Sequence, residues 1–126
     1  MLWCFMDRDL DKLEDILTAT ADIADFIAGL DYALFVAQRG RRYSVLHAFT
    51  IIGEAGSKLS AELRARHTSV PWQRIIDFRH RVVHGYDVLD LERTWQISVH
   101  FAPELRQQIQ AVLAIEYPDV TDTSVK

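Results

Sequence analysis

The stretch VPWQRIIDFRHRVVHGYD (residues 70–87) decides how the fold of this chain is interpreted. Pro71 suits the first turn of a helix, where its missing N–H would have no partner in any case. Gly85, at the other end of the stretch, is a common helix stop. Between them the apolar residues recur at helical spacing, at Trp72, Ile75, Ile76, Phe78 and Val82. The stretch therefore predicts a helix whose last turns carry basic residues and two histidines.

Three further segments show helical spacing of apolar residues, and none alternates as a strand would. The spacing predicts a first helix over about 7–28, closed by Gly29, and a second over about 43–65, preceded by a basic loop, RGRR (39–42). A last helix is expected over about 90–116. Pro103 should kink it, because proline cannot donate a hydrogen bond to the carbonyl of Val99. The expected fold is all-α: an up-and-down four-helix bundle with short additional helical or loop segments.

Length and composition fit one domain. The 126 residues are 49% hydrophobic and 25% charged, which excludes a disordered chain. No apolar run approaches the ~20 residues that cross a bilayer, and the acidic start of the chain does not resemble an export signal. The single Cys4 excludes an internal disulfide or a cysteine-based zinc site. We therefore expect a cytoplasmic helical domain over residues 1–117, a polar, frayed tail over 118–126, and no membrane partner.

Charge is unevenly distributed along the chain. Residues 1–38 contain two basic and eight acidic side chains, a net −6. Residues 39–84 contain nine basic and three acidic side chains, a net +6, and residues 85–126 contain three and seven, a net −4. A basic middle third suits an anionic partner, because phosphates respond to the local potential. A basic segment of this size can equally be a solvated face of the protein.

The segment RHRVVHGYD (79–87) allows three interpretations. Basic residues followed by a glycine are typical of an ordinary helix end. His80 and His84 share a helix face and could bind a metal ion, but zinc needs a third ligand and no HExxH-type glutamate lies between them. Alternatively, Arg79, His84 and Tyr86 form a small catalytic site.

Arg79 and His84 supply the minimum chemistry for metal-free cleavage of a phosphodiester. An arginine binds the phosphate and stabilises the charge that develops on it. A histidine titrates near neutrality and transfers a proton to or from the attacking or leaving oxygen. RNA carries its own nucleophile, the 2′-hydroxyl beside the scissile phosphate, so the reaction needs neither a metal nor a protein nucleophile.

Arg79, His84 and Tyr86 spell R-x4-H-x-Y, the signature of the HEPN superfamily of helical ribonucleases, which the chain resembles. More narrowly, it is similar to HepT, the toxin of the HepT/minimal nucleotidyltransferase toxin–antitoxin pairs. The segment IIGEAGSKL (51–59) resembles the IGEA-type helix of that family, and VPWQRIIDFRHRVVHGYDVLDLERTW (70–95) resembles its core block. The chain departs from the family pattern at His80, where many members have a polar residue, often Asn.

The resemblance implies a metal-independent endoribonuclease without a cofactor, which cuts RNA by 2′-hydroxyl attack and leaves a cyclic phosphate. Arg79 would stabilise the transition state, and His84 would be the general acid/base. A homodimer, or a higher dimer-based oligomer, would bring two motifs together in one cleft. Tyr86 would be the residue that a cognate, MntA-like nucleotidyltransferase antitoxin modifies with AMP. The added bulk and negative charge would then compete with the RNA phosphate for Arg79.

Five further residues could support such a site. His80 could share the proton transfer, and Arg81 could bind RNA beside it. Arg41 and Arg42 could line the RNA path or belong to a solvated basic loop. Glu54 could orient the catalytic pair or be a surface glutamate beside a close helix crossing. The alternative function is a non-catalytic HEPN module that binds RNA, a nucleotide or a nucleotidyltransferase partner without cutting.

Overall fold

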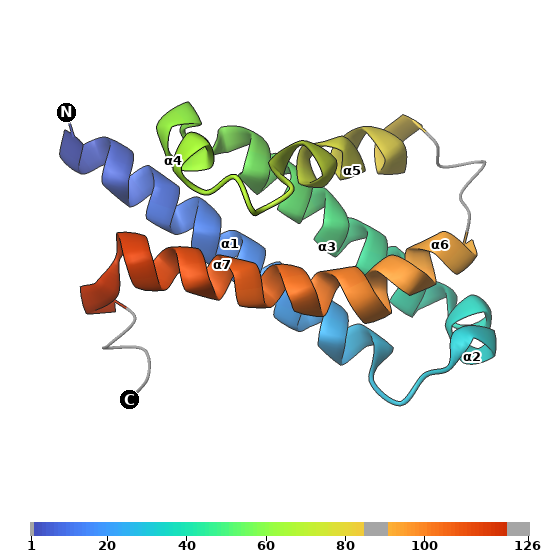
Figure 1. The fold of residues 1–126 in the computed structure, drawn as a ribbon. Coiled ribbons are helices and arrows are strands. Elements are labelled where there is room, and N and C mark those ends of the chain that lie inside the picture. Colours follow the sequence, from blue (N-terminus) through green and yellow to red (C-terminus); the bar gives the residue numbers. More distant parts are fainter. Residues whose placement is uncertain (1, 85–90, 121–126) are drawn as a thin grey trace.

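A computed structural model describes the backbone of residues 2–84 and 91–120 and the side chains of residues 8–78 and 91–120. All regular structure in these residues is helical (Figure 1), which confirms the predicted fold class. In chain order the elements are α1 (Leu2–Ile27), α2 (Tyr32–Ala37), α3 (Arg39–Lys58), α4 (Ala61–Arg66), α5 (Trp72–His84), α6 (Leu91–Gln96), the π-helical segment η2 (Ile97–Phe101) and α7 (Ala102–Glu116).

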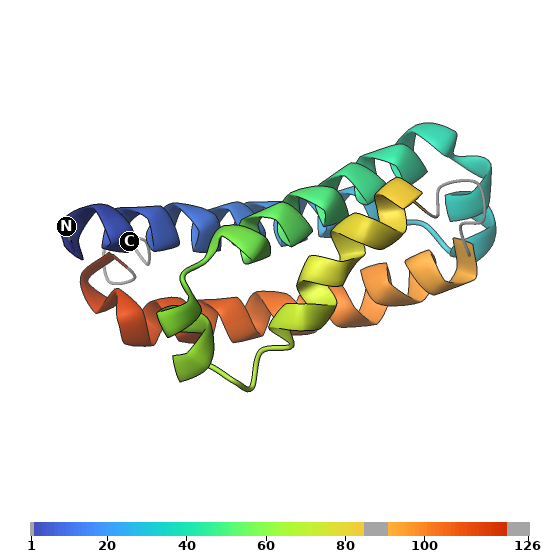
Figure 2. The same ribbon diagram turned by 90° about the horizontal axis from the view of Figure 1, so that it is seen from above.

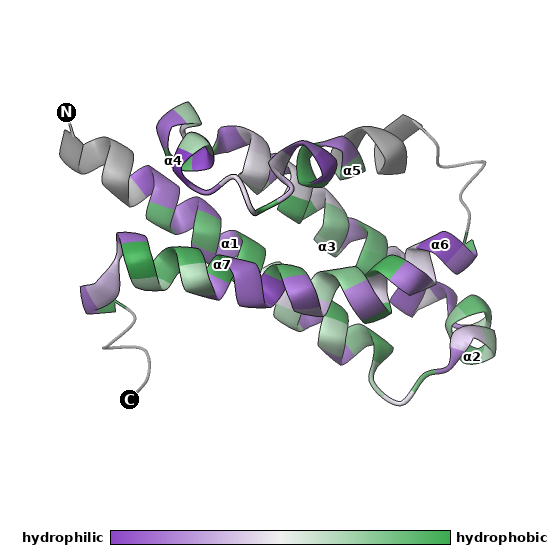
Figure 3. Cartoon of the chain, viewed as in Figure 1, coloured by the Kyte–Doolittle hydropathy of each residue, from purple (hydrophilic) through white to green (hydrophobic). Residues whose placement is uncertain are grey.

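The long helices alternate in direction and form a bundle (Figures 1 and 2). The first helix, α1, packs along α3 and α7, and α3 packs on its other side against α5. The short helices α2 and α4 lie at opposite ends of α3. Apolar and polar patches recur along the helices (Figure 3), as expected when each helix buries one face. In the part of the chain that is described, no helix is both long and apolar enough to cross a membrane.

One continuous core joins the four long elements. Its fully buried aliphatic side chains come from each of them, and burying a side chain of this size stabilises the fold by roughly 1.5–3 kcal/mol. These residues include Leu13, Ile16, Ile23, Val45, Ile52, Ile75, Leu105 and Ile109.

The corner between α1, α2 and α3 corrects one prediction. Gly29 closes α1 as expected, in the left-handed region with φ +75°. The RGRR segment is the first turn of α3 and not a loop. Arg41 Nη1 donates to the carbonyl oxygens of Phe26 (3.4 Å) and Ala28 (3.3 Å), and Arg42 donates to the carbonyl oxygen of Val36. The two arginines thus satisfy carbonyls that the ends of α1 and α2 leave without helical partners.

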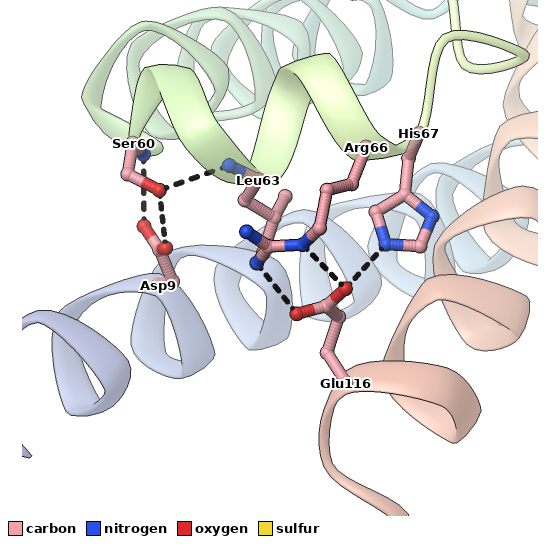
Figure 4. A network of polar contacts seen from close by, with 6 residues as sticks. All are labelled: Asp9, Ser60, Leu63, Arg66, His67 and Glu116. Atoms are coloured by element: carbon pink, nitrogen blue, oxygen red, sulfur yellow. Dashed lines mark hydrogen bonds and ion pairs between the residues drawn. The ribbon is translucent and has the colours of Figure 1, made fainter.

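The predicted helix over 43–65 is also wrong, because it breaks at Leu59 and Ser60. Ser60 is extended (φ −63°, ψ 148°) and caps α4, its hydroxyl accepting from the Leu63 amide at 3.2 Å. Asp9 fixes this break from α1. Its carboxylate accepts from the Ser60 amide at 2.9 Å and from the Ser60 hydroxyl at 2.7 Å (Figure 4).

The last predicted helix is helical from Leu91 to Glu116, and its irregularity falls just before Pro103, as expected. The irregularity takes the form of a π turn, η2, in which the Ala102 amide donates to the carbonyl of Ile97 five residues earlier. Pro103 has no N–H for the carbonyl of Val99 and its ring crowds that carbonyl, so a wider turn relieves the clash.

A second polar contact ties α4 to the end of α7 (Figure 4). Glu116 accepts two hydrogen bonds from Arg66, from Nε at 3.1 Å and from Nη2 at 2.7 Å. The Nε2 atom of His67 lies 2.7 Å from Oε2 of Glu116, the same oxygen that accepts from Arg66 Nε. The hydrogen bond from Arg66 lowers the pKa of Glu116 below its ordinary 4.5 and outweighs the opposing effect of burial, and His67 adds to the lowering.

We expect Asp9→Ala to lower the free energy of unfolding by about 2–3 kcal/mol, because it leaves the partly buried Ser60 donors without their acceptor. Urea unfolding measures this as a lower midpoint at an unchanged slope. Asp11→Ala, at an exposed position on the same helix, is the control and should leave the midpoint unchanged. Equal midpoints for the two variants would contradict a role for Asp9 at the break.

We expect Glu116→Gln to be less stable than the wild type at pH 7. The pKa of Glu116 is lower in the folded chain than in the unfolded one, so its ionisation favours folding above about pH 4.5 and this contribution is lost as the pH falls through the folded value. The difference in melting temperature between wild type and variant should therefore shrink below pH 4.5. Glu14→Gln, at an exposed position, should show no such pH dependence.

Candidate functional site

The motif lies at the end of α5, and α3 determines where α5 lies. The two helices approach closely at Gly56, where a Cβ would come within 3.1 Å of Ile75 Cγ2 and 3.6 Å of Ile76 Cγ1. Ile75 is fully buried and has little room to move. Glycine at position 56 therefore permits the short distance at which α5 packs on α3.

Three phenylalanines continue this contact across the bundle. The Phe49 ring, on α3, lies 5.3 Å from that of Phe78 on α5, and Phe78 lies 5.3 Å from Phe101 on η2, both in edge-to-face geometry. The guanidinium of Arg74 lies over the Phe101 ring, 4.5 Å from its centroid. The aromatic contacts thus join α5 to η2 as well as to α3.

Trp72 fixes the beginning of α5. Its indole Nε1 donates to the carbonyl of His67 at 2.9 Å, and the ring is 8% exposed. The carbonyl of Pro71 accepts from the Ile75 amide at 3.1 Å, which confirms that Pro71 belongs at the start of this helix. Trp72 and Phe78 are buried, so they serve packing and not base stacking.

From this fixed start α5 continues without a break to His84. It carries the backbone of Arg79, His80, Arg81 and His84, while their side chains and all of Gly85 and Tyr86 lie outside the described residues. Five steps of an ideal helix place the Cα atoms of Arg79 and His84 about 140° apart around the axis and about 7.5 Å apart along it. The roles of these residues stay predictions.

The supporting residues that are described lie in different places. Arg41 and Arg42 lie at the corner with α1 and α2, where they bond the carbonyls described above. Glu54 is exposed on α3, two residues before Gly56, and its carboxylate makes no hydrogen bond or ion pair with any side chain that is described. Contact of any of them with RNA stays a prediction.

The basic middle third of the sequence is not one basic surface. Arg41 and Arg42 lie at one end of α3 and Lys58 at the other, and 20 helical residues span about 30 Å. Arg66, on α4, is paired with Glu116 from the acidic last third. The basic side chains of this segment that are described are therefore spread over both ends of α3, over α4 and over α5.

Within residues 2–84 and 91–120, no group of three or more His, Cys, Asp or Glu side chains that the structure describes could hold a metal ion. The side chains of His80 and His84, considered above as a possible metal pair, lie outside that set.

The fold and the motif define a helical domain of HEPN type. The family model described as "Ribonuclease HepT-like" matches residues 16–112, which include the whole motif. The chain therefore belongs to the HepT-like ribonuclease family, as its resemblance to HepT predicted.

Relatives from archaea and bacteria agree with this assignment. The chain is 30% identical over 100 residues to "Putative RNase MJ1380" of Methanocaldococcus jannaschii, covering 79% of this chain and 92% of that protein. It is 29% identical to "Putative RNase TTE0752" of Caldanaerobacter subterraneus, covering 82% and 93%. It is 26% identical to "Probable ribonuclease HepT" of Thermococcus cleftensis, covering 79% and 91%. No solved structure matches the chain.

Three polar residues that the fold brings together follow no pattern in the sequence. Arg74 on α5, Arg93 on α6 and His100 on η2 line one groove. They are 26 residues apart from first to last, so no local spacing indicates them. The contacts of Phe101 with Phe78 and Arg74 place η2 beside α5.

Proposed function

We propose that the protein is a metal-independent endoribonuclease toxin in which Arg79 and His84 carry the reaction. The observation that carries the proposal is that the region matched by the HepT-like family, 16–112, contains R-x4-H-x-Y intact. The names of the relatives point to the same class of reaction. A continuous α5 that is held at its start by Trp72 supports the proposal, because it gives the motif a rigid base.

In the proposed reaction the 2′-oxygen attacks the adjacent phosphorus, a new P–O bond forms and the bond to the 5′-oxygen breaks. One proton leaves the 2′-hydroxyl and one is delivered to the departing 5′-oxygen. The products are a 2′,3′-cyclic phosphate and a 5′-hydroxyl. Arg79 binds the phosphate and stabilises the charge that grows on its oxygens, and His84 transfers a proton.

The two proton transfers favour a site made from two protomers. Each chain supplies one His84, while the reaction needs both a base and an acid. A homodimer that places two motifs around one phosphate would provide both, and it would also remove the difficulty that Arg79 and His84 lie about 140° apart on one helix. His80 is the other candidate for the second proton transfer.

Tyr86 is proposed as the site of control. It lies two residues after His84 and seven after Arg79. An AMP group attached there by a minimal nucleotidyltransferase antitoxin would add a phosphate within the same motif, which would compete with RNA for Arg79 and occupy space in the cleft.

We expect the wild type to cleave labelled RNA in EDTA, and we expect Arg79→Ala and His84→Ala each to lower the rate by about a hundredfold or more. His47→Ala, which removes an exposed histidine on α3, is the matched control and should retain full activity. Mass spectrometry of the products should find a cyclic phosphate.

The same experiment distinguishes the proposed ribonuclease from the alternative, a non-catalytic module. A wild type that binds RNA but cuts none in EDTA, with both variants still binding, would identify a non-catalytic RNA-binding module. Cleavage at the wild-type rate by either variant would contradict the assigned catalytic roles.

We expect coexpression with the cognate nucleotidyltransferase to add about 329 Da for each AMP to the intact mass, together with loss of cleavage. Tyr86→Phe should prevent the added mass and keep the ribonuclease active in the presence of the partner. Tyr43→Phe, at an exposed tyrosine of α3, should leave the modification unchanged. An adduct that persists in Tyr86→Phe would place the modification elsewhere.

A further inference from the structure

An open groove of about 280 Å³ lies between α5 and the α6–η2–α7 helix, and we call it the α5–η2 groove. Its walls carry two arginines, a histidine and a glutamine, with apolar surface from Ile97 and Phe101 and a carboxylate from Glu104. The groove follows from the packing of the bundle. The main helix pairs are α1 with α3, α3 with α5, and α1 with α7, and α5 packs less extensively against η2 than these pairs do.

One cationic side chain of this groove, that of Arg74, is held in place by an aromatic ring. Arg74 is exposed, yet its guanidinium is held over Phe101 at 4.5 Å from the ring centroid. Stacking on one face leaves the N–H groups at its edge directed outward in the plane, which is the geometry that binds phosphate oxygens. His100 and Arg93 are also exposed in the same groove, and both side chains can donate hydrogen bonds to an anion.

The position of the groove relates it to the motif. Arg74 precedes Arg79 by five residues on the same unbroken helix, so their Cα atoms lie about 7.5 Å apart along the axis and about 140° apart around it. Arg93 lies on α6, the next helix after the motif. The groove is thus bounded by the helix that carries R-x4-H and by the helix that follows it.

We propose that the α5–η2 groove binds a backbone phosphate of the RNA strand that is cut, with Arg74 as its main ligand and His100 and Arg93 beside it. This rests on the proposed function, because it assigns part of the substrate path of the same site. Phe101 positions Arg74, and Ile97 and Phe101 offer an apolar surface to the neighbouring sugar or base. Glu104 repels the phosphate, because both carry negative charge. Removing Arg74 should therefore weaken RNA binding, and removing the charge of Glu104 should tighten it.

The experiment measures binding of a single-stranded RNA to His84→Ala, in which the RNA stays intact, and to the same protein with a second substitution. Arg74→Ala should weaken binding about tenfold, and it should reduce the slope of log affinity against log salt by about 0.7, the value for one phosphate contact. Arg74→Lys should lie between, because it keeps the charge and loses the planar guanidinium.

Glu104→Gln should tighten binding by about fivefold, which corresponds to removing one like charge at short range in water. Tighter binding cannot come from a loss of folding. Together with this variant, weaker binding by Arg74→Ala can therefore be assigned to the groove and not to misfolding. Lys58→Ala, which removes an exposed cation outside the groove, is the control for net charge and should change the affinity much less.

The outcomes distinguish the two proposals. Opposite shifts for Arg74→Ala and Glu104→Gln support the groove, and if the wild type then fails to cut RNA in EDTA, only the catalytic proposal is overturned. If the wild type cuts RNA but both groove variants bind it as their parent does, only the groove is overturned. A protein that neither binds nor cuts RNA overturns both.

Discussion

The contact between α3 and α5 at Gly56 is the constraint on which the candidate site depends. A helix of 13 residues is marginal by itself in water, so α5 owes its order to what it packs against. Ile75 meets Gly56 at a distance that a larger residue would disturb, and Phe78 fills the space between Phe49 and Phe101. These contacts fix the axis of α5 before the motif begins. The chemistry of the motif therefore starts from a helix whose axis is set by core contacts and whose start is held by the Trp72 hydrogen bond.

The reversal that brings α5 back onto α3 depends on the break at Ser60. Without it the chain would continue along the axis of α3, away from the bundle. Asp9 holds the break through two hydrogen bonds across 51 positions of sequence, and the Arg66–Glu116 pair then fixes α4 to the end of α7. These polar contacts lie near the start of α5, where Trp72 donates to the carbonyl of His67, and so help to determine where the basic helix begins. The Asp9 carboxylate satisfies the amide of Ser60, which caps α4.

The sequence predicted the bundle well because each long helix keeps its apolar stripe. It missed the break for the same reason: Leu59 and Leu63 are both buried, so the stripe continues across the gap between α3 and α4. The sequence signal that could have indicated the break was Ser60, because serine is a typical residue at the start of a helix. The RGRR segment has no apolar residue and resembled a loop, since its helical form depends on carbonyls from other helices, which no local pattern records. In the site, Arg79 and His84 were predicted from their chemistry and Tyr86 from the resemblance to HepT, whereas the groove depends on which elements become neighbours.

Pro103 connects the irregularity of the last helix to the shape of the groove. A π turn inserts one residue into the helical repeat, which rotates the preceding side chains by about 100° relative to those that follow. His100 and Phe101 lie within this turn and Glu104 follows it directly. In a regular α-helix the stripe that buries Leu105 and Ile109 would continue backward in a different register, and Phe101 would not meet Phe78 and Arg74 in the same way. A proline that removes one hydrogen bond from α7 therefore aligns an aromatic ring under the arginine of α5, and the groove beside the motif exists because of that alignment.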